Sequence, residues 1–348
     1  MRKPLPQDDL QFIVEQTADV WATFDGARLF VTGGTGFIGS WLLEAIQHAN
    51  RVTSSHVEVV TLSRNAAKAR EYAPHLFDDG SVTLIEGDVT TFEADVGRID
   101  FCIHAATDVA DTKKAADALR MFDTGVAGTR RVLDFARKSG VARLLLTSSG
   151  AVYGPQPPSI EKMPESYMGA PDPLDPTTAY GQGKRAAEWL AATYAREGDL
   201  QVAIARIYAL VGPGIPLDGP FAAGNFIRDA IAGRPISMKG DGRPLRSYLY
   251  MADTCIWLLH MLLHAENGQA YNVGSEDALS IAALAKTIER LCGSRDSGLP
   301  TAARNDSDAP RYVPDTSKAR RSLGLAQYTG LETALSKTIN WNRTAVTQ

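Results

Sequence analysis

The stretch VTGGTGFIGSWLLEA, Val31–Ala45, joins the end of an apolar run to three spaced glycines and an amphipathic segment. Gly33, Gly36 and Gly39 follow the spacing G-x-x-G-x-x-G. Glycines at this spacing permit a tight turn, a close approach of backbone to a pyrophosphate, and close packing of a helix on a strand. The N-terminus of that helix would direct backbone N–H groups at phosphate charge. The stretch therefore predicts a strand–turn–helix unit that binds a dinucleotide.

Apolar runs and helical patterns alternate along the chain on both sides of this stretch. Runs without polar alternation are typical of strands that are covered on both faces, and regular strand–helix alternation is typical of a doubly wound parallel sheet. We therefore predict an α/β fold with a Rossmann-type parallel sheet and a smaller α/β lobe that binds substrate. The expected strands are 27–33, 57–63, 82–88, 99–106, 142–149 and 201–208, with helices at 37–49, 115–138 and 179–197.

The composition of the sequence changes near residue 212, where Gly/Pro-rich loops such as GPGIPLDGP begin. We predict an N-terminal helical extension at 1–26, a dinucleotide-binding domain at 27–211 and a substrate lobe at 212–348. In the last segment we expect helices near 220–232, 253–265, 280–292 and 331–343, and a strand at 270–275.

Composition and charge narrow the class of protein. The 348 residues carry a formal net charge of −4, which gives no long-range attraction to nucleic acid or anionic lipid. No run of 18 apolar residues occurs, so we expect no membrane span. Cys102, Cys255 and Cys292 are far apart and lack metal-ligand spacing, so we expect reduced thiols, no metal and a cytoplasmic location.

The residues after the second and third expected strands indicate which dinucleotide binds. A carboxylate after the second strand would accept a hydrogen bond from the ribose of NAD, whereas a cation would accommodate the 2′-phosphate of NADP. Here the strand ends in Ser63 and Arg64, with Lys68 four residues on and no acid. We therefore expect NADP, with NAD as the alternative if Arg64 stacks on adenine or points to solvent. Asp88 follows the third strand, where it can accept a hydrogen bond from the adenine amino group or serve as a turn residue.

The candidate catalytic group is Tyr180 with Lys184, spaced Y-x-x-x-K on an expected helix. Residues i and i+4 share one helix face. A phenol is too weak an acid to act near neutrality unless its pKa is lowered, which a nearby ammonium and a positive nicotinamide ring would do. Ser149, at the end of an expected strand, can hold the substrate oxygen. The pattern predicts proton transfer coupled to hydride transfer on an alcohol or carbonyl.

These features resemble the extended short-chain dehydrogenase/reductase family, specifically its nucleotide-sugar epimerases, dehydratases and decarboxylases, over roughly residues 28–343. The matching segments are TGGTGFIG, Asp88, HAAT at 104–107, Ser149, and the Tyr180–Lys184 pair. The resemblance implies an NAD(P)-dependent enzyme in which Ser149, Tyr180 and Lys184 are catalytic. The implied cofactor contacts are Gly33, Gly36, Phe37, Ile38, Gly39, Ser63, Arg64, Asp88, Val89, Ala105, Ala106, Thr107, Lys184 and Tyr208.

The second half of the chain extends the resemblance to the substrate. NFIRDAIAG at 225–233 and GDGRPLRSYLYMAD at 240–253 are similar to substrate loops of the UDP-glucuronate decarboxylase and 4-epimerase branches. This implies that Asn225 and Arg246 contact a nucleotide diphosphate, and a guanidinium can clamp a pyrophosphate in a bidentate manner. Ser149 and Tyr153 are the implied contacts of the sugar, with packing as the alternative role of Tyr153.

Departures from the family pattern bear on the reaction. Dehydratases carry Thr-Asp-Glu where this chain has Ser149, Gly150 and Ala151, and decarboxylases carry a Glu at the last position. The missing acids argue against dehydration and against the usual decarboxylation. Two family asparagines are also replaced, by Gly125 and Ala209, which weakens any hydrogen-bond map copied from relatives.

We therefore expect NADP-dependent reduction of a nucleotide-activated 4-keto-(deoxy)sugar, CDP- or dTDP-linked, by hydride transfer at C4. The alternatives are a nucleotide-sugar 4-epimerase that passes through a transient 4-ketone, and a 4,6-dehydratase with atypical acids such as Glu161 or Glu165. A non-catalytic dinucleotide-binding protein is a distant alternative. Relatives dimerise through two helices per subunit, here 115–138 and 179–197, and the pattern of Leu119, Phe122 and Val126 is compatible with a homodimer.

Overall fold

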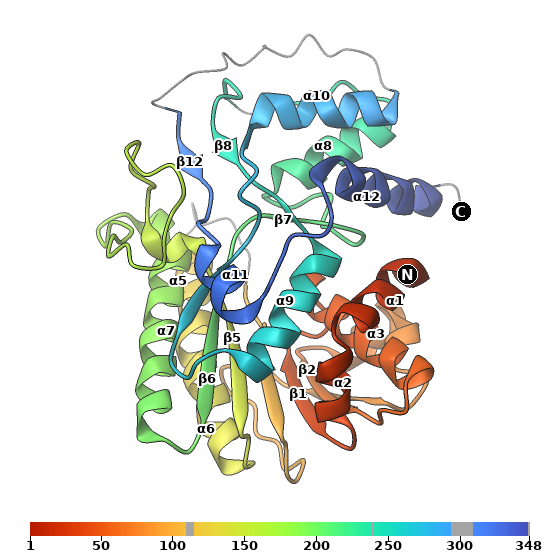
Figure 1. Cartoon of the computed structure of the whole chain (residues 1–348), viewed down its shortest axis with the longest axis vertical. Helices are drawn as coiled ribbons and strands as arrows, with labels where there is room; N and C mark the ends of the chain where they lie inside the picture. The colour runs from red at the N-terminus through yellow and green to blue at the C-terminus, as the bar shows by residue number, and fades with distance from the viewer. Residues whose placement is uncertain (109–114, 239, 294–308, 347–348) are drawn as a thin grey trace.

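The structure is a computed structural model that describes residues 1–108, 115–238, 240–293 and 309–346. Its centre is a seven-stranded sheet in the order β10-β6-β5-β4-β1-β2-β3, and all neighbouring strands run parallel (Figure 1). The chain runs outward from β1 through β2 to β3 and then returns to β4 on the other side of β1. Such a reversal leaves a crevice at the carboxyl ends of the strands. The strands are β1 (Arg28–Thr32), β2 (Glu58–Ser63), β3 (Val82–Glu86), β4 (Phe101–His104), β5 (Arg143–Ser149), β6 (Gln201–Ile207) and β10 (Ala270–Val273).

Helices cover both faces of the sheet, as the apolar strands require. Alternate residues of β1 point to opposite faces, so Leu29 and Val31 join one buried cluster and Phe30 joins another. The first face carries the N-terminal helices α1 (Gln7–Gln16) and α2 (Ala18–Phe24), then α3 (Phe37–Val52), α4 (Ala66–Tyr72), η1 (Pro74–Leu76) and α9 (Met251–His264). The second face carries α5 (Ala115–Asp123), η2 (Thr124–Gly128), α6 (Thr129–Lys138) and α7 (Ala179–Glu197).

A π-helical turn, η2, joins α5 to α6 and crosses α7 at very short range. A Cβ atom added to Gly125 would lie 3.2 Å from the backbone of Gly183, and one added to Gly183 would lie 3.4 Å from the backbone of Phe122. The glycines therefore set the separation of the two helices. This separation matters for function because α7 carries Tyr180 and Lys184.

The remaining elements form a lobe above the carboxyl ends of the strands (Figure 1). They surround a three-stranded sheet in the order β11-β8-β12 and a two-stranded sheet of β7 and β9. The helices are α8 (Ala222–Ile231), α10 (Ile281–Cys292), α11 (Ser317–Leu323) and α12 (Leu331–Val346), and short turns are η3 (Gly150–Tyr153) and η4 (Pro176–Thr178). The strands are β7 (Leu210–Val211), β8 (Leu245–Arg246), β9 (Leu249–Tyr250), β11 (Leu279–Ser280) and β12 (Arg311–Tyr312).

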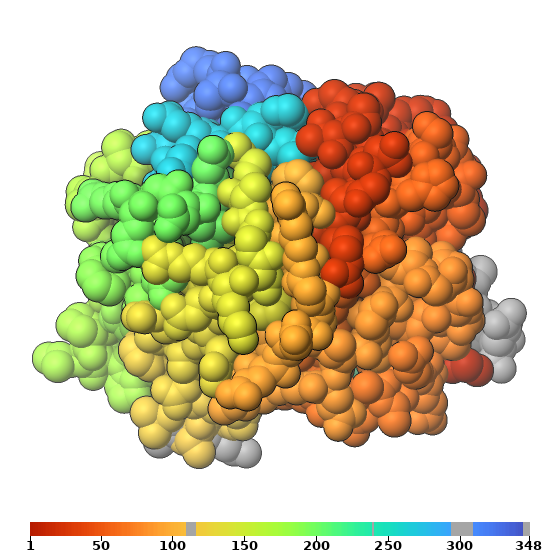
Figure 2. Space-filling model, turned by 90° about the horizontal axis from the view of Figure 1, so that it is seen from below, coloured from red at the N-terminus to blue at the C-terminus, as the bar shows by residue number. Residues whose placement is uncertain are grey.

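The predicted fold class, a doubly wound parallel sheet, is confirmed. The segment after residue 212 does not lie entirely in the lobe. Its strand β10 completes the large sheet, and its helix α9 packs against that sheet. Seen from below, the N-terminal segment lies beside the end of α9 (Figure 2). Within the residues that the structure describes, no helix combines the length and the apolar character needed to cross a membrane.

Candidate active site

A cavity of about 1260 Å³ opens at the carboxyl ends of β1, β2, β4, β5 and β6 and is closed above by the lobe. A pocket for one small ligand is typically about 300–1,000 Å³, so this cavity has room for more than one. Residues from both halves of the chain line it, from the glycine turn at one end to Arg246 and Tyr312 in the lobe. Its position matches the crevice expected at the reversal of strand order.

The glycine turn has the shape that a pyrophosphate site requires. Gly33 adopts φ +72°, and a Cβ atom there would lie 2.7 Å from the carbonyl of Ala105. A Cβ atom on Gly39 would lie 2.1 Å from the carbonyl oxygen of Gly33, so a side chain is excluded there too. Among the described residues, no side chain caps the start of α3 at Gly36, which leaves the N–H groups of its first turn for an anion.

The end of the cavity next to β2 and β3 carries four residues predicted to bind the cofactor: Ser63, Arg64, Asp88 and Val89. One carboxylate oxygen of Asp88 accepts hydrogen bonds from the backbone and hydroxyl of Thr90, at 2.9 and 2.6 Å, and these bonds lower the pKa of Asp88. The guanidinium of Arg64 is largely exposed and lies 3.9 Å from Asp108. This arrangement fits a dinucleotide: Thr90 fixes a carboxylate that can bind a base or ribose, and Arg64 supplies an exposed cation.

Four further residues that the resemblance assigns to the cofactor line the cavity: Ala105, Ala106, Thr107 and Tyr208. Tyr208 is 5% exposed, and its hydroxyl has no hydrogen-bond partner within the described part of the chain. Burial raises its pKa, so the hydroxyl stays protonated. A buried polar group without a partner costs free energy, which identifies this hydroxyl as one that a bound molecule can satisfy.

Tyr180 and Lys184 project from α7 into the same cavity. The Lys184 ammonium donates a 2.7 Å hydrogen bond to the carbonyl of Thr147 and lies 5.8 Å from the centre of the Tyr180 ring. Burial lowers the pKa of Lys184 to about 8, and nearby Glu188 opposes this shift. The lysine is thus fixed at the end of β5, next to the phenol.

The pKa of Tyr180 differs from the sequence-based expectation. Burial raises it above the ordinary value of a phenol, although hydrogen bonding with the hydroxyls of Ser149 and Thr107 acts in the opposite direction. The expected lowering by an ammonium and a nicotinamide cation is therefore not present in the chain alone. A protonated phenol at neutral pH is suited to donate a proton to a substrate oxygen rather than to remove one.

Tyr312 approaches the predicted catalytic residues from the lobe. Its hydroxyl lies 3.3 Å from the hydroxyl of Ser149, and its ring lies 4.5 Å from that of Tyr208, between centroids. A Cβ atom on Gly150 would lie 2.6 Å from the Tyr208 ring and 2.8 Å from the Tyr312 hydroxyl. The two tyrosines therefore fill the space in which a side chain at position 150 would stand.

Comparison with known proteins identifies the family. Residues 29–274 match the NAD dependent epimerase/dehydratase family. The chain belongs to this family. A UDP-glucuronic acid decarboxylase 3 of Arabidopsis thaliana is 31% identical over 298 residues, which is 85% of this chain and 83% of the relative. The solved dTDP-glucose 4,6-dehydratase DesIV of Streptomyces venezuelae has a TM-score of 0.77 at 26% identity, covering 91% of this chain and 97% of its own. MoeE5, solved with UDP-glucose and NAD, has a TM-score of 0.75 at 27% identity over 92% of this chain and all of its own.

The chain is thus an enzyme of the epimerase/dehydratase family, with the extended short-chain dehydrogenase/reductase architecture that the sequence indicated. The acids of the described cavity are confined to one end. The carboxylates among its described lining residues are Asp88 and Asp108, and both lie near Arg64. Glu161 is exposed and Glu165 accepts a hydrogen bond from the backbone of Asn272; neither lines the cavity.

Two predicted substrate residues do not line the cavity of this family member. Tyr153 is 2% exposed, and its hydroxyl donates to Asn272 and accepts from Arg206 at 2.9 and 2.8 Å, which favours its alternative role in packing. The amide of Asn225 donates to the carbonyl of Gly219 at 3.0 Å and is committed to its own loop. Arg246 does line the cavity, with its guanidinium 5.5 Å from the centre of the Tyr312 ring.

Sequence reasoning missed Tyr312, Tyr248 and Thr124, which all line the cavity. Tyr312 lies 163 residues from Ser149, and tertiary contacts such as the pairing of β12 with β8 bring it over the sheet. No local pattern marks such a residue. Thr124 lies in a π-helical turn, a feature that is frequent at functional sites and has no sequence signature here.

Proposed function

We propose that this enzyme reduces a nucleotide-activated 4-keto-(deoxy)sugar, CDP- or dTDP-linked, by NADP-dependent hydride transfer at C4. The observation that carries the proposal is the closed space over Gly150. Tyr208 and Tyr312 exclude a side chain there, and Ala151 supplies no acid, so the carboxylates used for elimination are absent beside Tyr180. Without those carboxylates, the groups left to act on a substrate carbonyl are Ser149, Tyr180 and Lys184.

The chain's own residues would move one proton during this reaction. When bound, reduced nicotinamide supplies the hydride. Tyr180 donates its proton to the carbonyl oxygen, which becomes the product hydroxyl. Ser149 holds that oxygen, and the positive charge of Lys184 stabilises the phenolate that is left until it regains a proton. Burial keeps the pKa of Tyr180 above the ordinary value of a phenol, so the phenol begins the reaction protonated.

The preference for NADP rests on the end of β2. Ser63, Arg64 and Lys68 line the cavity there, and a cation is the complement of a 2′-phosphate. The solved relatives DesIV and MoeE5 both contain NAD, so NAD is the competing outcome. Thermal shift with each oxidised dinucleotide separates the two: NADP must stabilise the chain more than NAD, and the reverse result contradicts the preference.

A 4-epimerase is the second candidate, because MoeE5 was solved with UDP-linked sugars and the same three catalytic residues suffice for a transient 4-ketone. Stoichiometry distinguishes the two reactions. A reductase consumes one reduced cofactor for each 4-keto sugar converted, so the absorbance of NADPH falls in proportion. An epimerase converts a UDP-sugar with no net change in that absorbance. Turnover of a 4-hydroxy sugar without added reductant contradicts the reductase.

We also propose that the active form is a homodimer. Leu119 on α5 and Trp189 on α7 are 65% and 66% exposed, and the two helices pack against each other on one face of the sheet. Exposed aromatic and aliphatic side chains on paired helices are typical of a helix–helix interface between copies. Phe122 and Val126, which the sequence pattern also suggested, are half-buried within the subunit.

A further inference from the structure

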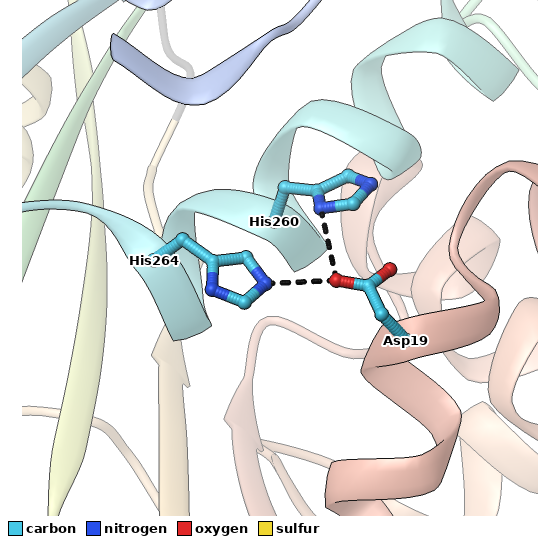
Figure 3. Close-up of side chains that lie close together, drawn as sticks. All are labelled: Asp19, His260 and His264. Atoms are coloured by element: carbon cyan, nitrogen blue, oxygen red, sulfur yellow. Dashed lines mark hydrogen bonds and ion pairs between the residues drawn. The ribbon is translucent and has the colours of Figure 1, made fainter.

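Two histidines and an aspartate meet on the face of the molecule that is covered by α2 and α9 (Figure 3). His260 and His264 are one turn apart on α9, and Asp19 lies in the first turn of α2. The Asp19 carboxylate lies 2.9 Å from Nε2 of His264 and 3.9 Å from Nδ1 of His260. One ligand atom from each side chain lies within 4.8 Å of the other two.

The backbones that carry these side chains are fixed. In α2, Val20 and Trp21 directly follow Asp19 and are at most 1% exposed, and the carbonyl of Trp21 accepts a hydrogen bond from Ser55. In α9, the residues between the histidines are buried in the main core. Rigid elements hold a ligand set better than loops do. Small rotations of three partly exposed side chains are then enough to adjust the geometry.

The hydrogen bond of His260 orients its ring for a cation. Its Nε2 lies 3.1 Å from the carbonyl oxygen of Gln16. A carbonyl only accepts, so Nε2 carries the proton and the lone pair of the neutral ring is on Nδ1. That lone pair faces Asp19. A ligating histidine commonly donates its other N–H to a carbonyl in this way, which fixes the ring and its tautomer.

We propose that Asp19, His260 and His264 bind a zinc ion that links the N-terminal helices to α9. In a tetrahedral site with bonds of about 2.0–2.1 Å, ligand atoms stand about 3.3 Å apart, within the spread found here. The fourth position is left for water. Imidazole and carboxylate ligands suit zinc, whereas magnesium and calcium take oxygen ligands. The histidines occupy the last turns of α9, where the helix dipole favours a cation.

This site is independent of the proposed reaction, because it lies on a different part of the molecule from the cavity and shares no residue with it. Its role is structural. Asp19 belongs to the segment that precedes β1, and zinc would add a bond between that segment and a helix of the main core. A ligand that binds the folded state alone stabilises it in proportion to the logarithm of its concentration.

The direct test is zinc binding to the full chain after treatment with a chelator. Competition with a zinc-sensitive dye gives the affinity of wild type, His264→Ala, Asp19→Asn and a control, His56→Ala. The control residue pairs with Asp25 at 3.6 Å and has no third ligand among the described residues. We expect one zinc per chain, a loss of more than tenfold for each ligand variant, and no change for the control.

A second measurement keeps the proposal falsifiable if a variant folds poorly. Cobalt replaces zinc, and the absorption spectrum of tetrahedral cobalt must appear with wild type. The spectrum must be absent with His264→Ala, whose fold is checked by circular dichroism. Zinc, and not magnesium, must also raise the melting temperature of wild type and of His56→Ala. Equal zinc affinity in all variants, or binding that persists when both histidines are removed, overturns the site and shows an ordinary aspartate–histidine pair.

Discussion

At the scale of single residues, Tyr180 bears the largest predicted effect. Tyr180→Phe keeps the ring but removes the proton that the reaction needs, so kcat should fall by about 10²–10⁴-fold. Cofactor affinity should hardly change, since Lys184 keeps its bond to Thr147. Stopped-flow kinetics and cofactor titration measure the two effects. The control is Tyr194→Phe on the same helix, whose hydroxyl bonds Asp134 away from the cavity. If the Tyr180→Phe enzyme remains active, Tyr180 is not the proton donor.

Tyr312 should contribute to substrate binding through its hydroxyl. Tyr312→Phe keeps the ring that packs on Tyr208 but removes the group 3.3 Å from Ser149. Loss of one hydrogen bond to the reacting region is worth about 1.4 kcal/mol, so kcat/KM should fall about tenfold. The melting temperature should stay within a few degrees of wild type. A fall in stability with unchanged kcat/KM would assign Tyr312 to packing alone.

The pH dependence should report Lys184. Burial lowers its pKa to about 8, so the side chain is charged below that pH and neutral above it. The charge stabilises the phenolate that proton donation leaves, and kcat/KM for the reduction should therefore fall as pH rises through about 8. A profile of kcat/KM from pH 6 to about 10 tests this. A rate that is flat across this range contradicts the role given to Lys184.

At the scale of elements, the sequence predicted the helices and the strands of the large sheet well. It did not predict the short strands that form only through tertiary pairing. The helix expected at 179–197 is α7 and the strand expected at 142–149 is β5, because the first has a helical pattern and the second is a continuous apolar run. The two-residue strands β8 and β12 have no such period and exist through pairing with each other. The sequence therefore could not indicate that Tyr312 lines the cavity. Tyr153 lies outside the cavity for a related reason: its side-chain direction depends on the short turn η3.

The crossing of η2 and α7 gives a prediction at this scale. Gly125→Ala would place a methyl group 3.2 Å from the backbone of Gly183, and a shift of that backbone would also move the adjacent Lys184. Overpacking of this kind costs about 1–3 kcal/mol. The free energy of unfolding should fall by that amount in urea titration, with some loss of activity. Gly330→Ala is the control, since nothing lies within 4 Å of its added Cβ. Equal stability of both variants contradicts tight packing at the crossing.

At the scale of the whole molecule, the site is assembled from segments that are far apart in the chain. The glycine turn, the end of β5, the start of α7 and the strand β12 meet in one cavity because the sheet aligns its carboxyl ends and the lobe covers them. The residues predicted for the cofactor include a local motif, the glycine turn, and the structure places them along the cavity. The predicted substrate residues depend on how the lobe sits on the sheet. The sequence around Asn225 and Arg246 does not show whether either side chain reaches the cavity.

Oligomeric state is the prediction that belongs to the whole molecule. If α5 and α7 pair with a second copy, Trp189 becomes buried at the interface, and a carboxylate there would be desolvated without a partner. Trp189→Asp should therefore convert a dimer to a monomer with its fold intact, because the residue is exposed in the subunit. Sedimentation velocity measures the mass. Leu174→Asp, in the loop before α7 and 90% exposed, is the matched control and should stay dimeric. A wild-type chain that sediments as a monomer at micromolar concentration rules out this interface, and dimerisation that survives Trp189→Asp places the interface elsewhere.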